Sequence, residues 1–111
     1  MRLNKDLVAA SAEPLVLSIL AKAESYGYAI IKEVQALSKG QIEWTEGMLY
    51  PVLHRLELQG FVKSYWKISE TGRKRKYYRI REQGLLQLKS LVDAWNVANE
   101  ALRASRRTVN V

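Results

Sequence analysis

Residues 45–61, TEGMLYPVLHRLELQGF, combine the periodicity of a helix with side chains that a protein core does not require. Thr45 is a favourable N-cap residue, and Gly60 is a typical residue just after a helix end. Phe61 can then fold back onto the last turn. Four apolar residues follow the spacing i, i+3, i+4, i+7 and predict one buried stripe: Leu49, Val52, Leu53 and Leu56. The stretch therefore predicts a short amphipathic helix with defined ends.

The opposite side of this helix carries residues suited to contact a polyanion. Gly47 costs roughly 1 kcal/mol against alanine within a helix. Pro51 removes the backbone hydrogen bond to the Gly47 carbonyl, which a helix tolerates only near its start. Tyr50, His54 and Arg55 are predicted to project away from the apolar stripe, where a tyrosine can bind a phosphate and an arginine can contact a phosphate or a guanine edge. The structural alternative is that Tyr50 and Pro51 pack against a neighbouring helix.

Two helices are expected before this stretch. The first follows Pro14, with Ser11 as its start signal. Apolar residues within residues 3–8 are expected to extend it toward the N-terminus, in which case Pro14 would mark a kink. The second helix is expected over residues 25–38, with Gly40 as a stop signal.

Two strands and a long helix are expected after residue 61. Residues 62–68 alternate between apolar and polar side chains, a turn follows, and residues 76–80 return as a second strand. Trp66 is on the apolar face of this pattern, and we interpret both Trp66 and Trp44 as core or staple residues. The last helix is expected over residues 82–106.

The order helix, helix, helix, hairpin, helix is typical of a winged helix-turn-helix with one added C-terminal helix. The expected fold class is mainly α with a small β-hairpin. The helix-turn-helix domain, including the N-terminal helix, would span residues 1–81, and residues 82–111 would form a dimerisation helix and tail. In such a fold the second helix of the reading pair enters the major groove with its N-terminal half, and the hairpin is the wing.

The basic charge of the chain is concentrated in the predicted hairpin. The formal net charge is +7, and residues 63–81 contain eight lysines and arginines against one glutamate, which is also a net +7. A localised patch of this kind is typical of phosphate binding, and each neutralised phosphate contributes roughly −0.9 to the slope of log affinity against log salt. The alternative is a solvated basic hairpin with no nucleic-acid partner. Four of the charges lie at the predicted turn: Arg73, Lys74, Arg75 and Lys76.

The composition argues against several other classes of protein. The chain has no cysteine, and His54 is its only histidine, so neither a disulfide framework nor a metal site is expected. It has no Gly-rich phosphate loop and no nucleophile at a recognisable spacing from a histidine and a carboxylate, so neither an enzyme nor a cofactor is expected. No apolar run approaches the roughly 20 residues of a membrane span, and the N-terminus lacks a secretory signal. A cytoplasmic protein is the expectation.

The last predicted helix carries a second apolar stripe. Its members are spaced 3, 4, 3, 4, 3, as in a heptad seam: Leu85, Leu88, Val92, Trp95, Asn99 and Leu102. Because the helix is too long for a single small core to cover, the stripe favours a homodimer interface, which Leu3, Leu7 and Val8 would close on its other side. The alternative is that the stripe packs on the chain's own first helix.

Together these motifs resemble the PadR family of bacterial transcriptional regulators, in particular its short members with a single C-terminal dimerisation helix. TEGMLYPVLHRLELQGFV is similar to the family signature around the recognition helix, and YGYAI at 26–30 is similar to the start of its second helix. RKRKYYRI and the nearby EQG are similar to its wing and the entry to its last helix. The similarity covers most of residues 13–95. It implies a homodimer that binds a pseudo-palindromic operator in double-stranded DNA, usually as a repressor.

Three residues qualify this resemblance. Arg81 stands where family members commonly have a threonine that caps the last helix, so a less fixed helix start is expected. Tyr26 stands where histidine is frequent. Multidrug-sensing members are similar around Trp95, which implies two indoles that face each other across a dimer pore and sandwich a planar aromatic molecule. The alternative is that Trp95 fills the dimer core without a cavity.

The expected function is a dimeric repressor relieved by a small planar aromatic ligand. The alternatives are a constitutive DNA- or RNA-binding protein without a ligand pocket, and a protein-interaction module that uses the long helix. The predicted DNA-binding residues are Tyr26, Thr45, Gly47, Met48, Tyr50, Pro51, His54, Arg55, Arg73, Lys74, Arg75 and Lys76. The predicted ligand-binding residues are Leu7, Leu91, Val92, Trp95 and Asn99.

Overall fold

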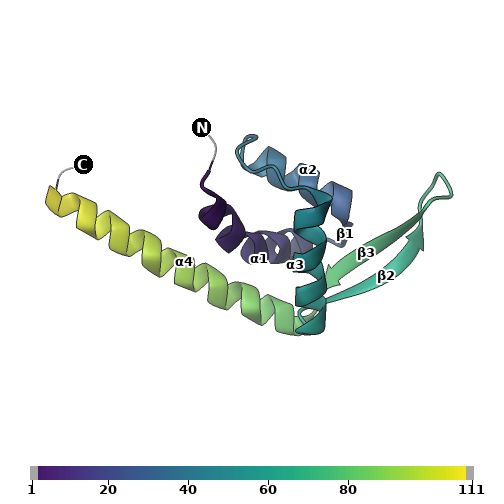
Figure 1. Cartoon of the computed structure of the whole chain (residues 1–111). Coiled ribbons are helices and arrows are strands. Elements are labelled where there is room, and N and C mark those ends of the chain that lie inside the picture. The colour runs from purple at the N-terminus through teal and green to yellow at the C-terminus, as the bar shows by residue number, and fades with distance from the viewer. Residues whose placement is uncertain (1–2, 110–111) are drawn as a thin grey trace.

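The computed structural model describes residues 3–109, which form a winged helix followed by a long C-terminal helix (Figure 1). This confirms the predicted mainly α fold class. The sheet is antiparallel and has three strands in the order β1-β3-β2, one strand more than expected. The elements are α1 (Lys5–Lys22), β1 (Ser25–Tyr26), α2 (Gly27–Leu37), α3 (Glu46–Leu58), β2 (Val62–Ile68), β3 (Lys74–Ile80) and α4 (Glu82–Val109).

Helix α1 begins at Lys5, about two turns before the predicted start signal, Ser11. Asn4 is its N-cap, and the Asn4 side chain accepts a hydrogen bond of 2.7 Å from the backbone N–H of Asp6. The hydroxyl of Ser11 instead donates to the carbonyl of Val8 within the helix, at 2.9 Å, as serines inside helices often do. The prediction of a start at Ser11 is therefore wrong, whereas the predicted N-terminal extension is present.

The predicted start of the second helix at Ser25 is also wrong, because Ser25 and Tyr26 form strand β1. Ser25 pairs with Tyr78 and Tyr26 with Tyr77 in antiparallel register, and α2 begins at Gly27. A two-residue strand is too short to show the alternation by which strands are recognised in a sequence. Its consequence is that the start of α2 is attached to the wing, which we define as residues 62–80.

Helix α3 has the ends that the sequence predicts. The Thr45 hydroxyl accepts a hydrogen bond of 3.2 Å from the backbone N–H of Met48. Beyond the helix, Gly60 adopts a left-handed conformation with φ of 79°, and the backbone N–H of Phe61 donates to the carbonyl of Leu56 at 3.0 Å. Both ends of the helix are thus fixed by local contacts.

The core lies between the first three helices and the base of the sheet. Trp44 is 4% exposed, which confirms its predicted place in the core. Leu49, Leu53 and Leu56 are fully buried, as the stripe on α3 predicts, and Val52 is partly buried against them. The remaining buried apolar residues are Ala12, Val16, Leu17, Ile19, Leu20, Ile30, Val34, Ile42, Val62 and Tyr78.

The interpretation of Trp66 as a core or staple residue is wrong. The wing extends past the helices, so the apolar face of its outer half has no helix to cover it (Figure 1). Trp66 is 62% exposed, and it pairs in the strand register with Lys76. The Nζ atom of Lys74 lies 6.0 Å from the centre of its indole ring, which is a cation–π distance.

The first turn of α4 packs tightly against the chain that links α3 to β2. The backbone N–H of Arg81 donates to the carbonyl of Phe61 at 2.9 Å. Gly84 is buried one turn later, and a Cβ atom there would clash with the same Phe61 carbonyl oxygen and lie 2.7 Å from Cγ1 of Ile80. These contacts hold the start of α4 in place, although Arg81 does not offer the side-chain cap that a threonine would.

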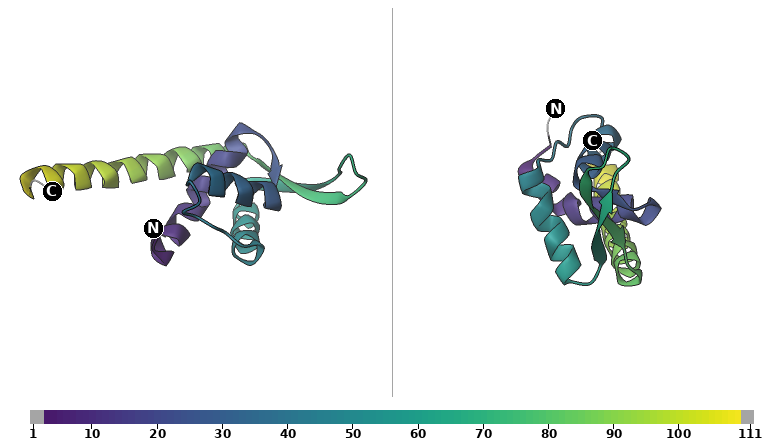
Figure 2. Two further views of the ribbon diagram at one scale, coloured as in Figure 1. Left: turned by 90° about the horizontal axis from the view of Figure 1, so that it is seen from above. Right: turned by 90° about the vertical axis from the view of Figure 1, so that its right-hand side faces the viewer.

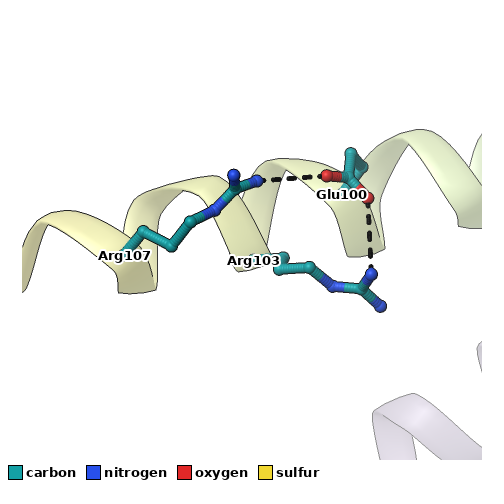
Figure 3. A network of polar contacts seen from close by, with 3 residues as sticks. All are labelled: Glu100, Arg103 and Arg107. Atoms are coloured by element: carbon teal, nitrogen blue, oxygen red, sulfur yellow. Dashed lines mark hydrogen bonds and ion pairs between the residues drawn. The ribbon is translucent and has the colours of Figure 1, made fainter. Parts of the chain in front are cut away.

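Beyond its first turns, α4 projects away from the rest of the molecule, opposite to the wing (Figures 1 and 2). The molecule accordingly measures 58 × 31 × 21 Å along its principal axes. Near the end of α4, Glu100 forms ion pairs with Arg103 at 3.8 Å and Arg107 at 3.3 Å (Figure 3). Within residues 3–109, no helix combines the length and the apolar character that crossing a membrane requires.

Tyr78 gives the fold a specific dependence on alkaline pH. Burial raises the pKa of Tyr78 to about 12, with smaller contributions from Tyr50 and Glu57. The ordinary pKa of tyrosine is about 10, so between about pH 10 and 12 the unfolded chain releases the proton while the folded chain keeps it. This contribution to the free energy of unfolding is complete below pH 10 and falls by up to about 1.4 kcal/mol per pH unit above it.

We therefore expect Tyr78→Phe to flatten the loss of stability between pH 10 and 11.5. Urea unfolding of both proteins at several pH values measures this, and other titrating groups cancel in the comparison. Equal slopes for the two proteins would contradict the assignment to Tyr78.

Candidate nucleic-acid interface

An open cleft of about 630 Å³ lies between the wing and the N-terminal ends of α2 and α3. We call it the wing cleft. Its walls combine aromatic rings with the basic end of the hairpin, and Glu46 is its one acidic residue. It is lined by Tyr26, Gly27, Tyr28, Glu46, Tyr50, Trp66, Arg73, Lys74, Arg75 and Lys76. A site of this composition presents positive charge and flat rings to the same bound group.

The wing cleft gathers half of the predicted DNA-binding residues from three separate elements. These are Tyr26, Tyr50, Arg73, Lys74, Arg75 and Lys76. The prediction that all four basic residues lie at the turn is wrong, because β3 begins at Lys74 and only Arg73 precedes it. Sequence reasoning missed Gly27, Tyr28, Glu46 and Trp66. The aromatic alternation of β2 was visible in the sequence, but we assigned Trp66 to the core because the pattern shows a face and not what covers it. Tyr28 is part of the quoted motif YGYAI, and its 57% exposure sets it apart from the buried side of α2.

Tyr50 is positioned by its contact with the start of α2. A Cβ atom added at Gly27 would lie 2.5 Å from the Tyr50 hydroxyl oxygen, so only glycine allows the tyrosine to occupy this place. Tyr50 nevertheless remains 39% exposed. One edge of Tyr50 therefore packs against α2, as the structural alternative proposed, while the rest of the ring is exposed. Pro51 is exposed and does not follow that alternative.

The other predicted residues of α3 lie outside the lining of the wing cleft. Gly47, Pro51 and His54 are exposed along the same helix. Thr45 caps the helix by accepting a hydrogen bond from the backbone N–H of Met48. The side chain of Met48 is partly buried against the core. Around residues 47, 51 and 54 the helix thus shows a small, unobstructed surface beside the cleft.

The geometry between α3 and the wing is fixed by a carboxylate. Glu57 Oε2 accepts hydrogen bonds from the Ser64 hydroxyl at 2.5 Å and from the Ser64 backbone N–H at 3.3 Å. These bonds join the last turn of α3 to β2. The C-terminal end of α3 is therefore tied to the base of the wing.

The outer face of the sheet carries a ladder of tyrosines. The ring of Tyr77 lies 5.2 Å from that of Tyr26 and 6.2 Å from that of Tyr65, between ring centres. Arg75 lies over Tyr26 at 4.5 Å, and Lys67 lies over Tyr77 at 4.9 Å. Tilted and stacked rings with cations over them stiffen the hairpin, because each contact joins side chains of neighbouring strands.

Glu24 completes this outer face. Hydrogen bonds from Tyr65 and Lys67 lower the pKa of the Glu24 carboxyl, and the bond to Glu24 raises the pKa of Lys67. The distance from Lys67 Nζ to Glu24 Oε2 is 3.1 Å. Lys67 is thus engaged within the protein, whereas Arg73 and the first three residues of β3 line the wing cleft.

Arg55 lies on the flank of α3 that faces α1. Its Nη2 atom is 4.0 Å from Oε1 of Glu13 on α1. The other oxygen of Glu13 accepts a hydrogen bond of 2.9 Å from the side chain of Gln87 on α4. Arg55 therefore contacts the body of the protein as well as solvent, which the sequence did not indicate.

A second, apolar cleft of about 300 Å³ lies between α1 and α4, and we call it the α1–α4 cleft. It is lined by Ser11, Pro14, Leu15, Ser18, Val92, Trp95 and Asn96. Of the predicted ligand-binding residues, Val92 and Trp95 belong to it. Leu91 packs on the core, whereas Leu7 and Asn99 are exposed outside the lining. The α1 wall could not be derived from the sequence, because it depends on how two helices pack.

Most of the predicted seam on α4 is uncovered in the single chain. Leu88 is the member that packs partly on the core. Leu85, Val92 and Trp95 are 48%, 44% and 40% exposed, and Leu102 is 64% exposed. Packing on the chain's own first helix therefore accounts for only part of the stripe. The residues 3–109 include no group of three or more histidine, cysteine or carboxylate side chains that could hold a metal ion.

Comparison with known proteins places this arrangement among transcriptional regulators. The model of the Transcriptional regulator PadR-like family matches residues 16–90. Transcriptional regulator YqjI of Escherichia coli (strain K12) is 28% identical over 90 residues, which cover 81% of this chain and 42% of YqjI. The chain thus spans less than half the length of this curated relative.

Solved structures show the same likeness over most of the chain. A transcriptional regulator from Clostridium thermocellum aligns with a TM-score of 0.83 and 29% identity, covering 92% of this chain and 96% of that one. A PadR family transcriptional regulator from Eggerthella lenta DSM 2243 aligns with a TM-score of 0.75 and 33% identity, covering 89% and 84%. Coverage of this extent includes part of α4.

Proposed function

The chain belongs to the Transcriptional regulator PadR-like family, and on this premise we propose that it binds a specific operator in double-stranded DNA as a homodimer. The family and the relatives named above are transcriptional regulators and not enzymes. In the proposed complex the exposed surface of α3 enters the major groove, and the wing lies along the adjacent sugar–phosphate backbone.

The wing cleft is the observation that carries this proposal. Its four basic residues, Arg73 to Lys76, lie beside the exposed side of α3, whose last turn is hydrogen-bonded to β2 through Glu57 and Ser64. Phosphate contacts position a protein on DNA, and groove contacts then read the bases. Tyr50 and Trp66 offer a hydroxyl and a flat indole to the sugar–phosphate backbone. His54 and Pro51 face the groove in this arrangement.

The exposed seam of α4 supports the homodimer. Apolar residues at heptad spacing are exposed along a helix that projects from the rest of the chain (Figure 2). A soluble protein rarely exposes an apolar stripe without a partner, and a second copy of the same helix presents the matching stripe. Two copies would also place two reading helices in the arrangement that a pseudo-palindromic operator requires.

The test is binding to the DNA upstream of the protein's own gene, compared with a scrambled duplex and with single-stranded DNA and RNA. Fluorescence anisotropy at several salt concentrations gives the affinity, and sedimentation gives the number of chains per site. We expect a preference for the upstream duplex with two chains bound. Equal, salt-sensitive binding to all duplexes would contradict a specific operator, and preference for single strands would favour the RNA-binding alternative.

We further propose that the protein is a repressor that a planar aromatic molecule releases from DNA, with Trp95 as the ligand-stacking residue. The α1–α4 cleft supports this, because its lining is almost wholly apolar and Trp95 forms one wall. Trp95 also lies on the exposed seam, so the second chain would close the cleft with its own indole. A planar aromatic ligand would stack on the two indoles with its rings offset from theirs.

Trp95→Ala is expected to weaken binding of the planar dye proflavine by about tenfold or more, because the stacking face is lost. Titration of the protein against dye fluorescence, without DNA, measures this affinity. The matched control is Trp66→Ala, which removes an exposed tryptophan far from the α1–α4 cleft and should leave dye binding unchanged. The Trp95→Ala protein should remain a dimer; unfolding or dissociation would support a role for Trp95 in the core alone.

A further inference from the structure

Three helices meet at the side chain of Glu13, which is part of neither cleft. Glu13 Oε2 accepts a hydrogen bond of 2.9 Å from the Gln87 side chain on α4. Glu13 Oε1 lies 4.0 Å from Arg55 Nη2 on α3. Each oxygen of one carboxylate is therefore directed to a different helix, and Glu13 itself comes from α1.

The two partners differ in how much water they retain. The side chain of Glu13 is 20% exposed, whereas that of Arg55 is 53% exposed. The carboxylate is thus held between helices, with one oxygen fixed by Gln87. The guanidinium is at the surface, beside the exposed side of α3, and is free to leave Glu13 for another anion. An ion pair of this kind is weak and salt-sensitive, so a phosphate can replace the carboxylate.

We propose that Glu13 is a positioning residue that competes with the DNA backbone for Arg55 and thereby links α4 to DNA affinity. This rests on the proposed binding of duplex DNA by α3. While Arg55 is paired with Glu13, it is turned toward α1 and its charge is partly neutralised. When DNA binds, a phosphate replaces the carboxylate, and the energy of the internal pair is subtracted from the affinity.

The link to α4 follows from the position of Glu13 on α1. The neighbouring Pro14 and Leu15 line the α1–α4 cleft, opposite Val92 and Trp95. A shift of α4 against α1 changes the Gln87–Glu13 hydrogen bond, because its two atoms belong to those two helices. Packed helices move between discrete arrangements with shifts of an ångström or two, which is enough to break such a bond. The same shift therefore alters the hold of Glu13 on Arg55.

Glu13→Gln tests the competition. It keeps the shape and the hydrogen-bonding ability of the side chain but removes the charge that holds Arg55. We expect affinity for the upstream duplex to rise about two- to fivefold at low salt, the range of a surface ion pair. The gain should shrink as the salt concentration rises, because salt screens the Glu13–Arg55 pair of the unaltered protein and so weakens its competition with phosphate.

A matched control separates this effect from a change in net charge. Glu33 on α2 forms an ion pair with Lys22 at 2.6 Å, and Glu33→Gln removes the same charge without touching Arg55. An equal gain in affinity for Glu33→Gln would overturn the proposal. Weaker binding by Glu13→Gln would also overturn it, because Glu13 would then present Arg55 to DNA and not withhold it.

Two further variants identify the partners. In an Arg55→Ala background, Glu13→Gln should no longer change DNA affinity. If Glu13 acted only through the stability of the fold, the change in affinity would persist without Arg55. Gln87→Leu should raise the affinity in the same direction as Glu13→Gln but by less, since Glu13 is then no longer fixed. No effect of Gln87→Leu would overturn the link to α4.

The outcome is distinguishable from that of the proposed function, because specific binding by the unaltered protein is measured independently of these variants.

Discussion

Replacing Arg73, Lys74, Arg75 and Lys76 together by glutamine is expected to abolish most of the salt-dependent affinity for duplex DNA. These four residues line one wall of the wing cleft, so a homodimer would lose eight positive charges at its DNA-facing surface. A protein that makes 6–10 phosphate contacts loses about 10³–10⁵ in affinity between 50 and 200 mM salt. The unaltered dimer should show a dependence of this order, and the variant should retain only a small part of it.

The measurement is duplex affinity at four salt concentrations between 50 and 200 mM, for operator and scrambled DNA. At 50 mM salt we expect the variant to bind both at least about a hundredfold more weakly than the unaltered protein. The loss should be similar on the two sequences, because phosphate contacts position the protein and do not read bases. Circular dichroism should show an unchanged fold, because these four residues are not buried.

The control removes four charges outside the wing cleft. Lys5, Lys22, Lys39 and Arg107 are exposed in the single chain, and their replacement by glutamine changes the net charge by the same amount. This variant should keep most of the affinity. Equal losses in the two variants would mean that DNA senses the total charge of the protein, and the wing cleft would no longer be the phosphate site.

Gly84→Ala is expected to have the largest effect on stability. The added methyl group would clash with the backbone carbonyl oxygen of Phe61 and with the side chain of Ile80. Relief of the clash must move the start of α4 or the Phe61 peptide, which also accepts the hydrogen bond from Arg81. Overpacking of this kind costs about 1–3 kcal/mol, and it outweighs the gain of up to about 1 kcal/mol from the better helix propensity of alanine.

The same substitution at Gly47 provides the control. A Cβ atom at Gly47 would meet only the Thr45 hydroxyl oxygen, at 3.9 Å, so Gly47→Ala should leave stability unchanged or raise it. Denaturant unfolding of both variants at one protein concentration separates the two cases. Equal stability of the two variants would show that the start of α4 adjusts freely, and the tight packing at Gly84 would have no energetic role.

The sequence predicted the elements that depend on local contacts. Helix α3 has the predicted ends because Thr45 and Gly60 act within a few residues of themselves. The basic segment 73–76 could be located because charge is visible in the sequence, but its assignment to a turn was wrong, because β3 begins at Lys74. Trp66 was assigned wrongly because alternation identifies a strand face but not the protein that covers it. Strand β1 was missed because two residues carry no period, and their pairing with β3 depends on distant residues.

The candidate site shows the same division. Thr45, Tyr50 and the basic residues 73–76 were identified from local patterns, and their roles remain predictions. The contacts of Arg55 with Glu13, and of Glu13 with Gln87, join residues separated by 42 and 74 positions in the chain, so no periodicity or motif could indicate them. The walls of the α1–α4 cleft likewise depend on the packing of two helices far apart in the sequence.

Helix α4 also has the mechanics of a rigid lever. It is a single helix of 28 residues whose first turn is locked to the winged domain at Gly84. At 1.5 Å per residue it is about 42 Å long, so a tilt of about 5° at one end displaces the other by about 4 Å. Consecutive half-sites on DNA are about 34–36 Å apart, and a displacement of this size is more than a tenth of that spacing. A tilt of α4 that is too small to disturb the seam would therefore be enough to move the two α3 helices of a dimer out of register with consecutive half-sites on DNA.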